Sequence, residues 1–98
     1  MFVSTEPAAM TTAASGLMGI GTTMTATNAG VAAPTTGVIP PGMEETSAML
    51  AAAFATHGAV YQAVSGMATA FHQMMVANLA VNAGTYEAVD AAGAIAAL

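Results

Sequence analysis

The sequence contains no cysteine, lysine or arginine. Without cysteine the chain has no disulfide, no thiolate metal site and no thiol nucleophile. Lys and Arg supply most nucleic-acid affinity by neutralising phosphates, so their absence argues against DNA or RNA as a partner and disfavours an anionic membrane surface. A secretory signal peptide also begins with positive charge, so any export is expected to use a different signal.

Long apolar runs are scarce too, although 56% of the residues are hydrophobic. The longest strictly apolar run, residues 48–55, is far shorter than the roughly 18 to 20 residues of a membrane-spanning helix, so no such helix is expected. A chain of 98 residues forms at most one small domain, which buries only about 60% of its unfolded surface. Nine Met residues, whose side chains adapt to irregular apolar contacts, therefore indicate a surface that binds a partner.

The first helix is predicted over residues 7–33. Pro7 suits a first turn, and an apolar row recurs every seven residues, as in the seam of a coiled coil: Met10, Leu17, Met24 and Val31. The next stretch, residues 34–42, is rich in helix breakers and is predicted to be a loop that begins where the first of them ends the helix: Pro34, Gly37, Pro40 and Pro41. Two helices joined by so short a link are expected to pack antiparallel.

The second helix is predicted over about residues 43–82, followed by a tail at 85–98, because Asn82-Ala-Gly84 is typical of a helix end. It carries two apolar rows. Residues three and four apart form the first: Leu50, Phe54, His57, Tyr61, Val64, Ala68, Phe71, Met75 and Asn78. Residues seven apart form the second: Ala53, Val60, Met67, Met74 and Val81.

A two-helix hairpin has no enclosed core, so it cannot cover both rows by itself. The first row could face the first helix, and the second row would then need a partner to cover it, but the spacing alone leaves open which row meets which neighbour. No alternating strand pattern is present. The predicted fold class is therefore all-α: an antiparallel two-helix hairpin, residues 1–84, that completes a four-helix bundle with a partner.

Catalytic and metal sites have little support. The two histidines, His57 and His72, are fifteen residues apart without cysteine or nearby carboxylates, so we interpret them as interface or partly exposed residues. Glu44 and Glu45 lie in a first turn, where the helix dipole favours anions. No Gly-x-Ser-x-Gly elbow or phosphate loop occurs. No enzyme activity, metal or cofactor is expected.

Several stretches resemble the PE domain of mycobacterial PE proteins. The residues that carry the resemblance are 32–41 (AAPTTGVIPP), similar to the family's interhelical loop, 61–65 (YQAVS), 71–76 (FHQMMV), and Tyr86 with Asp90, similar to the family's Tyr-x-x-x-Asp/Glu signal. One position departs from the family pattern. Pro7 is followed by Ala8 instead of Glu, and Glu6 precedes it.

The resemblance implies a heterodimeric four-helix bundle with a PPE protein, exported by a type VII (ESX) secretion system. It also implies that Tyr86 and Asp90 belong to the export signal, which is read together with the partner's Trp-x-Gly turn. An EspG-type chaperone would bind the PPE partner, not this chain. The pair would be cytoplasmic before export and secreted or at the cell surface afterwards, where a role in host interaction or virulence is open.

Two alternatives remain from the sequence. One is a self-associating hairpin resembling the small secreted WXG-type proteins, although no Trp-x-Gly turn is present. The other is a pore or transport component of the outer envelope, formed together with a PPE protein.

Overall fold

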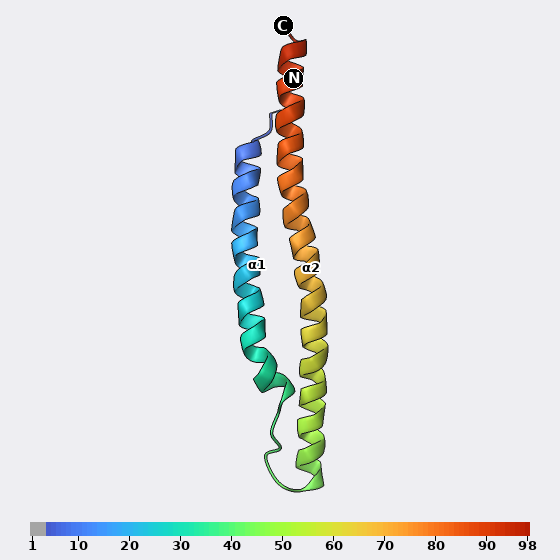
Figure 1. Ribbon diagram of the computed structural model, residues 1–98. Helices are drawn as coiled ribbons and strands as arrows, with labels where there is room; N and C mark the ends of the chain where they lie inside the picture. The colour runs from blue at the N-terminus through green and yellow to red at the C-terminus, as the bar shows by residue number, and fades with distance from the viewer. Residues whose placement is uncertain (1–3) are drawn as a thin grey trace. The chain divides into compact units, whose positions relative to one another are not determined.

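The computed structural model describes residues 4–98, which form two helices, α1 at Pro7–Thr36 and α2 at Glu45–Ala96 (Figure 1). These residues contain no strand, so the predicted all-α class is confirmed. The chain divides into two compact units. Unit 1 combines Met1–Gly21 with Phe71–Leu98, and unit 2 is Thr22–Ala70.

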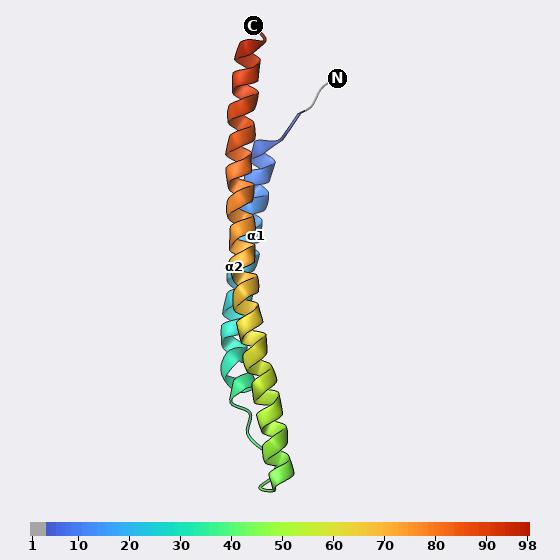
Figure 2. The same ribbon diagram turned by 90° about the vertical axis from the view of Figure 1, so that its right-hand side faces the viewer.

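In unit 1 the beginning of α1 packs against the later part of α2. Leu17 contacts His72, and Thr5, just before α1, contacts Asp90. Residues later in α1 thus meet residues earlier in α2, so the two segments are antiparallel. Both views show α2 continuing past the start of α1 (Figures 1 and 2).

In unit 2 the rest of α1 is followed by the connecting loop and the start of α2 (Figure 2). Asn28 contacts Ser65, and Thr35 lies against Gly58, so the helices are antiparallel here as well. The antiparallel arrangement predicted for a hairpin is therefore present within each unit.

The end of α1 differs from the prediction, because the helix continues through Pro34 to Thr36. Proline lacks the N–H that would bond to the carbonyl four residues back. The hydroxyls of Thr35 and Thr36 instead donate to the carbonyls of Val31 and Ala32, at 2.6 and 2.7 Å, and the Gly37 amide donates to Ala33 at 2.9 Å. These bonds hold the carbonyls of residues 31–33, and the final turn of α1 therefore continues past Pro34 although the Gly30 carbonyl loses its usual amide donor.

The start of α2 is held by Glu44. Its carbonyl accepts the Ala48 amide at 3.3 Å, and its carboxylate accepts the hydroxyl of the buried Ser47. The hydrogen bond from Ser47, followed by one from the backbone amide of Glu44, lowers the pKa of the Glu44 carboxyl. Because the pKa is lowered, this contact supports the helix start above the usual carboxyl pKa and is lost as acid protonates the group.

The far end of α2 also differs from the prediction, since the helix runs to Ala96 instead of stopping near Asn82. A glycine ends a helix by adopting positive φ, and no glycine among the described residues does so. Ala83, just before Gly84, is only 2% exposed, and alanine, the best helix former, recurs through the residues that follow. Packing at Ala83 and the propensity of the later residues therefore outweigh the Asn-Ala-Gly signal.

Small side chains fill the contact between the helices. The buried residues are Ala14, Ser47, Ala51, Gly58 and Ala83, and no large side chain among residues 4–98 is fully buried. From Ala51 to Ala83 the buried and half-buried positions of α2 recur alternately four and three residues apart. In unit 2 they are Ala51, Ala55, Gly58, Gln62, Ser65 and Thr69, and in unit 1 they are His72, Val76, Leu79 and Ala83. We call these positions the inner seam of α2.

Candidate interaction surface

The first apolar row predicted on α2 does not face α1. Its large side chains are exposed in both units: Leu50, Phe54, Tyr61 and Val64 in unit 2, and Phe71 and Met75 in unit 1. Phe54 is 58% exposed and Phe71 is 69% exposed. Of the two possibilities left open by the sequence, packing of this row against α1 does not occur, because the inner seam occupies that position.

The physical reason lies in side-chain size. The inner seam and the predicted row have the same spacing of three and four residues, so periodicity alone cannot say which one faces α1. Small residues let the two backbones approach closely. A Cβ on Gly58 would overlap the Thr35 carbonyl group, lying 2.8 Å from its carbon. A row of Leu, Phe and Tyr would hold the helices further apart.

The second predicted row is exposed as well: Val60 and Met67 in unit 2, and Met74 and Val81 in unit 1. Residues three and four apart are neighbours on a helix surface, so Val60, Val64 and Met67 join the two rows within unit 2. Phe71, Met74 and Met75 join them within unit 1. The two rows thus merge into one apolar face in each unit, which we call the outer face of α2.

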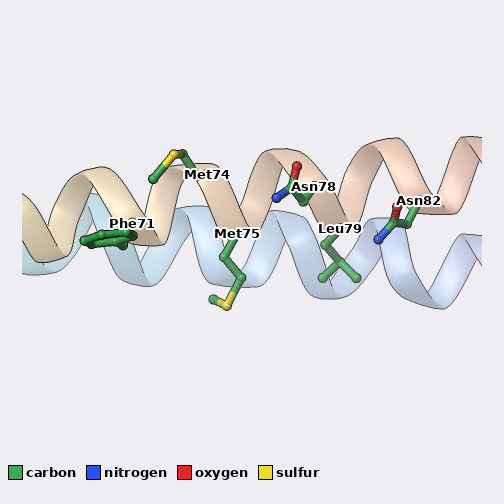
Figure 3. Close-up of a pocket in the computed structure, with 6 residues that line it drawn as sticks. All are labelled: Phe71, Met74, Met75, Asn78, Leu79 and Asn82. Atoms are coloured by element: carbon green, nitrogen blue, oxygen red, sulfur yellow. The ribbon is translucent and has the colours of Figure 1, made fainter.

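In unit 1 the outer face contains a shallow, open groove, whose lining side chains all come from α2 (Figure 3). The lining residues are Phe71, Met74, Met75, Asn78, Leu79 and Asn82. The Asn78 and Asn82 amides are the only polar groups among them, and no carboxylate or imidazole contributes. Such a groove suits apolar side chains of another protein better than a chemical reaction.

The row predicted on α1 is split between the units. Met10 and Leu17 are half-buried in unit 1, whereas Met24 and Val31 in unit 2 are exposed. In unit 2 the half-buried residue of α1 between Met24 and Val31 is Asn28.

Asn28 joins three residues of α2 in unit 2. Its side-chain amide donates to Ser65 Oγ at 2.7 Å, and its side-chain oxygen accepts the Tyr61 hydroxyl at 2.9 Å. Gln62 donates to its backbone carbonyl at 3.2 Å. The Tyr61 ring is 49% exposed, so this residue binds α1 through its hydroxyl while its ring remains on the outer face. These bonds fix the register of the two helices, a role that the apolar pattern does not reveal.

The two histidines have different environments. His57 is exposed on the outer face in unit 2. In unit 1, His72 is half-buried, its Nε2 lies 2.6 Å from the Leu17 carbonyl oxygen, and its ring covers Gly21 so closely that a Cβ there would lie 2.7 Å from the ring. Across residues 4–98, no cluster of three His, Asp or Glu side chains is placed to hold a metal ion.

Tyr86 and Asp90 lie one turn apart in unit 1, on the part of α2 that was predicted to be a separate tail. Tyr86 is 46% exposed, and Asp90 is exposed as well. The Asp90 carboxylate accepts a hydrogen bond from the Thr5 hydroxyl at 2.8 Å. Neither helix offers a stretch of sufficient length and hydropathy to cross a membrane, within the residues that the structure describes.

Comparison with known proteins matches residues 3–93 to the family model described as the PE family. The chain belongs to the PE family. The resemblance predicted from the loop and the helical motifs is therefore confirmed.

Three relatives from Mycobacterium tuberculosis illustrate the match. This PE protein is 50% identical to the PE family protein PE13 over 96 residues, which covers 98% of this chain and 97% of that protein. It is 44% identical to PE8 over 98% of this chain but 35% of that protein. It is 45% identical to the PE-PGRS family protein PE_PGRS8 over 95% of this chain and 53% of that protein. The chain thus spans nearly all of PE13, about half of PE_PGRS8 and about a third of PE8. None of these names is that of an enzyme.

Proposed function

We propose that this PE protein is one subunit of a heterodimer with a PPE protein, in which helices of both chains form a four-helix bundle. The observation that carries the proposal is the outer face of α2, where Leu50, Phe54, Val64, Phe71 and Met74 are exposed. Because the chain belongs to the PE family, we take a PPE protein as the partner. The role is one of protein interaction and not of catalysis.

The energetic reason is the imbalance between what the chain buries and what it exposes. Its buried hydrophobic residues among 4–98 are three alanines, and each of these has little side-chain area to remove from water. A fully buried Leu, Phe or Met contributes about 1.5 to 3 kcal/mol. Covering the outer face with a partner therefore stabilises the folded chain more than its own inner seam does, and we expect the subunit to depend on its partner for stability.

Co-expression tests this dependence. Expressed alone, the protein is expected to be insoluble or oligomeric, and a co-expressed PPE partner is expected to give a soluble complex of one copy of each chain. Native mass determination of the purified material distinguishes the outcomes. A stable, soluble monomer at micromolar concentration would refute the proposal, and a soluble homodimer would favour the WXG-like alternative.

We further propose that the pair is exported by a type VII (ESX) secretion system and that Tyr86 and Asp90 belong to the export signal. Both side chains lie on the same side of α2 and are exposed, so a receptor can reach them. Neither belongs to the inner seam, which means that both can be changed without disturbing the packing of α1 on α2.

Secretion assays on single variants test the signal. Tyr86→Ala and Asp90→Ala are each expected to block export while the heterodimer still forms, because the two residues lie outside the seam and the outer face. Glu87→Ala is the matched control, since Glu87 is an exposed acid on the same turn and should be exported normally. Unchanged export of both test variants, measured as the secreted fraction in culture filtrate, would remove Tyr86 and Asp90 from the signal.

A further inference from the structure

One side-chain hydrogen bond joins the two chain segments that make up unit 1. The Thr5 hydroxyl donates to Asp90 Oδ2 at 2.8 Å, across 85 positions of sequence. Thr5 is half-buried and lies two residues before α1 begins at Pro7. The start of the helix is fixed beside it, because the Glu6 carbonyl accepts the Met10 amide at 3.1 Å. Thr5 therefore offers a donor from a defined backbone position.

The part of α2 that carries Asp90 is otherwise loosely held. Ala83 is the last buried residue of α2, and every residue from Gly84 to Leu98 is exposed. The chain has no Lys or Arg, so no such cation can pair with this carboxylate. An exposed aspartate with no partner samples several staggered rotamers. A hydroxyl that donates to one of its oxygens restricts that choice.

The contact leaves the carboxylate able to bind something else. A carboxylate oxygen pair accepts up to about four hydrogen bonds, and Thr5 donates to Oδ2 only. Within residues 4–98, Oδ1 remains for a donor from outside the chain. Tyr86 lies one turn earlier on the same side of α2, so a receptor that contacts Tyr86 meets an already oriented carboxylate.

We infer that Thr5 is a positioning residue of the export signal: its hydrogen bond to Asp90 Oδ2 orients the carboxylate beside Tyr86, so that the signal includes a residue before α1 as well as residues of α2. This inference rests on the proposed role of Tyr86 and Asp90 in export. It adds a residue from before α1 to a signal that sequence pattern places wholly in the last part of the chain.

The first test measures the contact itself, on the PE protein in complex with its partner. Thr5→Val removes the hydroxyl and keeps the shape of the side chain. It is expected to speed amide hydrogen exchange in residues 87–96 by about two- to tenfold, the range that corresponds to one hydrogen bond. Thr5→Ser should keep the original rate. In an Asp90→Ala background, Thr5→Val should cause no further change, because its acceptor is already absent.

The second test measures export of the same variants. Thr5→Val is expected to reduce the secreted fraction about three- to tenfold, and Thr5→Ser should restore it, with equal heterodimer yield throughout. Thr12→Val is the matched control, since the Thr12 hydroxyl donates only to the Ala8 carbonyl of its own helix, at 3.0 Å.

The outcomes separate the two proposals. If Tyr86→Ala and Asp90→Ala block export but Thr5→Val is exported like the original protein, the export signal stands and the role of Thr5 is refuted. Unchanged amide exchange in Thr5→Val would refute it as well. If Tyr86→Ala and Asp90→Ala are exported normally, the proposed signal fails and the role of Thr5 fails with it.

Discussion

Phe71→Ala is expected to weaken the assembly of this PE protein with the proposed PPE partner by about 3 to 5 kcal/mol, the usual cost of truncating a buried phenylalanine. The dissociation constant would rise about a hundredfold or more, since each 1.4 kcal/mol is about a factor of ten. Phe71 is 69% exposed in the single chain, so its truncation should leave the contact between α1 and α2 intact. Phe54→Ala, in unit 2, should act in the same direction.

Titration calorimetry or surface plasmon resonance with the purified partner measures this effect. Ile39→Ala is the control, because Ile39 is 85% exposed in the connecting loop and lies outside the outer face. The affinity of the Ile39→Ala variant for the partner should equal that of the original protein. Equal affinity for Phe54→Ala and Phe71→Ala would show that the partner covers a different surface.

Gly58→Ala is expected to destabilise the helix pair of unit 2 by about 1 to 3 kcal/mol, the range for overpacking a close contact. The added Cβ would overlap the carbonyl group of Thr35, and backbone atoms cannot swing away as the end of a side chain can. The overlap also affects the last turn of α1, which contains Pro34 and in which the Thr35 and Thr36 hydroxyls donate to backbone carbonyls. The expected loss is the net effect, after the gain in helix propensity of about 1 kcal/mol for glycine to alanine.

Gly66→Ala provides the opposite control in the same helix. A Cβ on Gly66 has no neighbour within 4 Å, so only the gain in propensity remains and the variant should be slightly more stable. Thermal unfolding followed by far-UV circular dichroism compares the two variants in the assembly in which the protein purifies. A Gly58→Ala melting temperature equal to or above that of Gly66→Ala would contradict the close approach at Thr35.

The elements of the fold were predictable where local chemistry and packing agree. Pro7 and the repeat of Met10 and Leu17 place the first helix correctly at its start, and the proline-rich loop separates it from the second. The predicted helix ends differ from the observed ones where packing or a side-chain contact overrides the local sequence signal. The last turn of α1 contains Pro34 and has threonine hydroxyls bonded to its carbonyls, and α2 continues past Gly84, where Ala83 is buried.

Which face of α2 packs against α1 was less predictable, because the answer depends on the size and polarity of the side chains and not on their spacing. The sequence contains two rows with helical spacing, and the larger side chains suggest a core. In unit 2 the structure instead pairs the helices mainly through Ala, Gly, Ser and Thr with polar contacts from Asn28, and in unit 1 through His72, Val76, Leu79 and Ala83. Small residues recur with four-three spacing from Ala51 to Gly58 and again at Ser65 and Thr69, which indicates the seam in unit 2, whereas His72, Val76 and Leu79 give no such signal in unit 1. The bond from Thr5 to Asp90 joins residues 85 positions apart and leaves no local pattern.

The inner seam and the outer face lie on different sides of α2, so the two sets of positions tolerate amino-acid substitution differently. A larger side chain at Gly58 would overlap the Thr35 backbone, and one at Ala83 would not fit, because Ala83 is already buried. Substitutions at these two positions therefore alter the hairpin itself. At Phe54, Val64 or Met74 one apolar side chain can replace another without moving α1. Copies of such a chain that differ only on the outer face would therefore keep the same hairpin and differ in the partner surface that they fit.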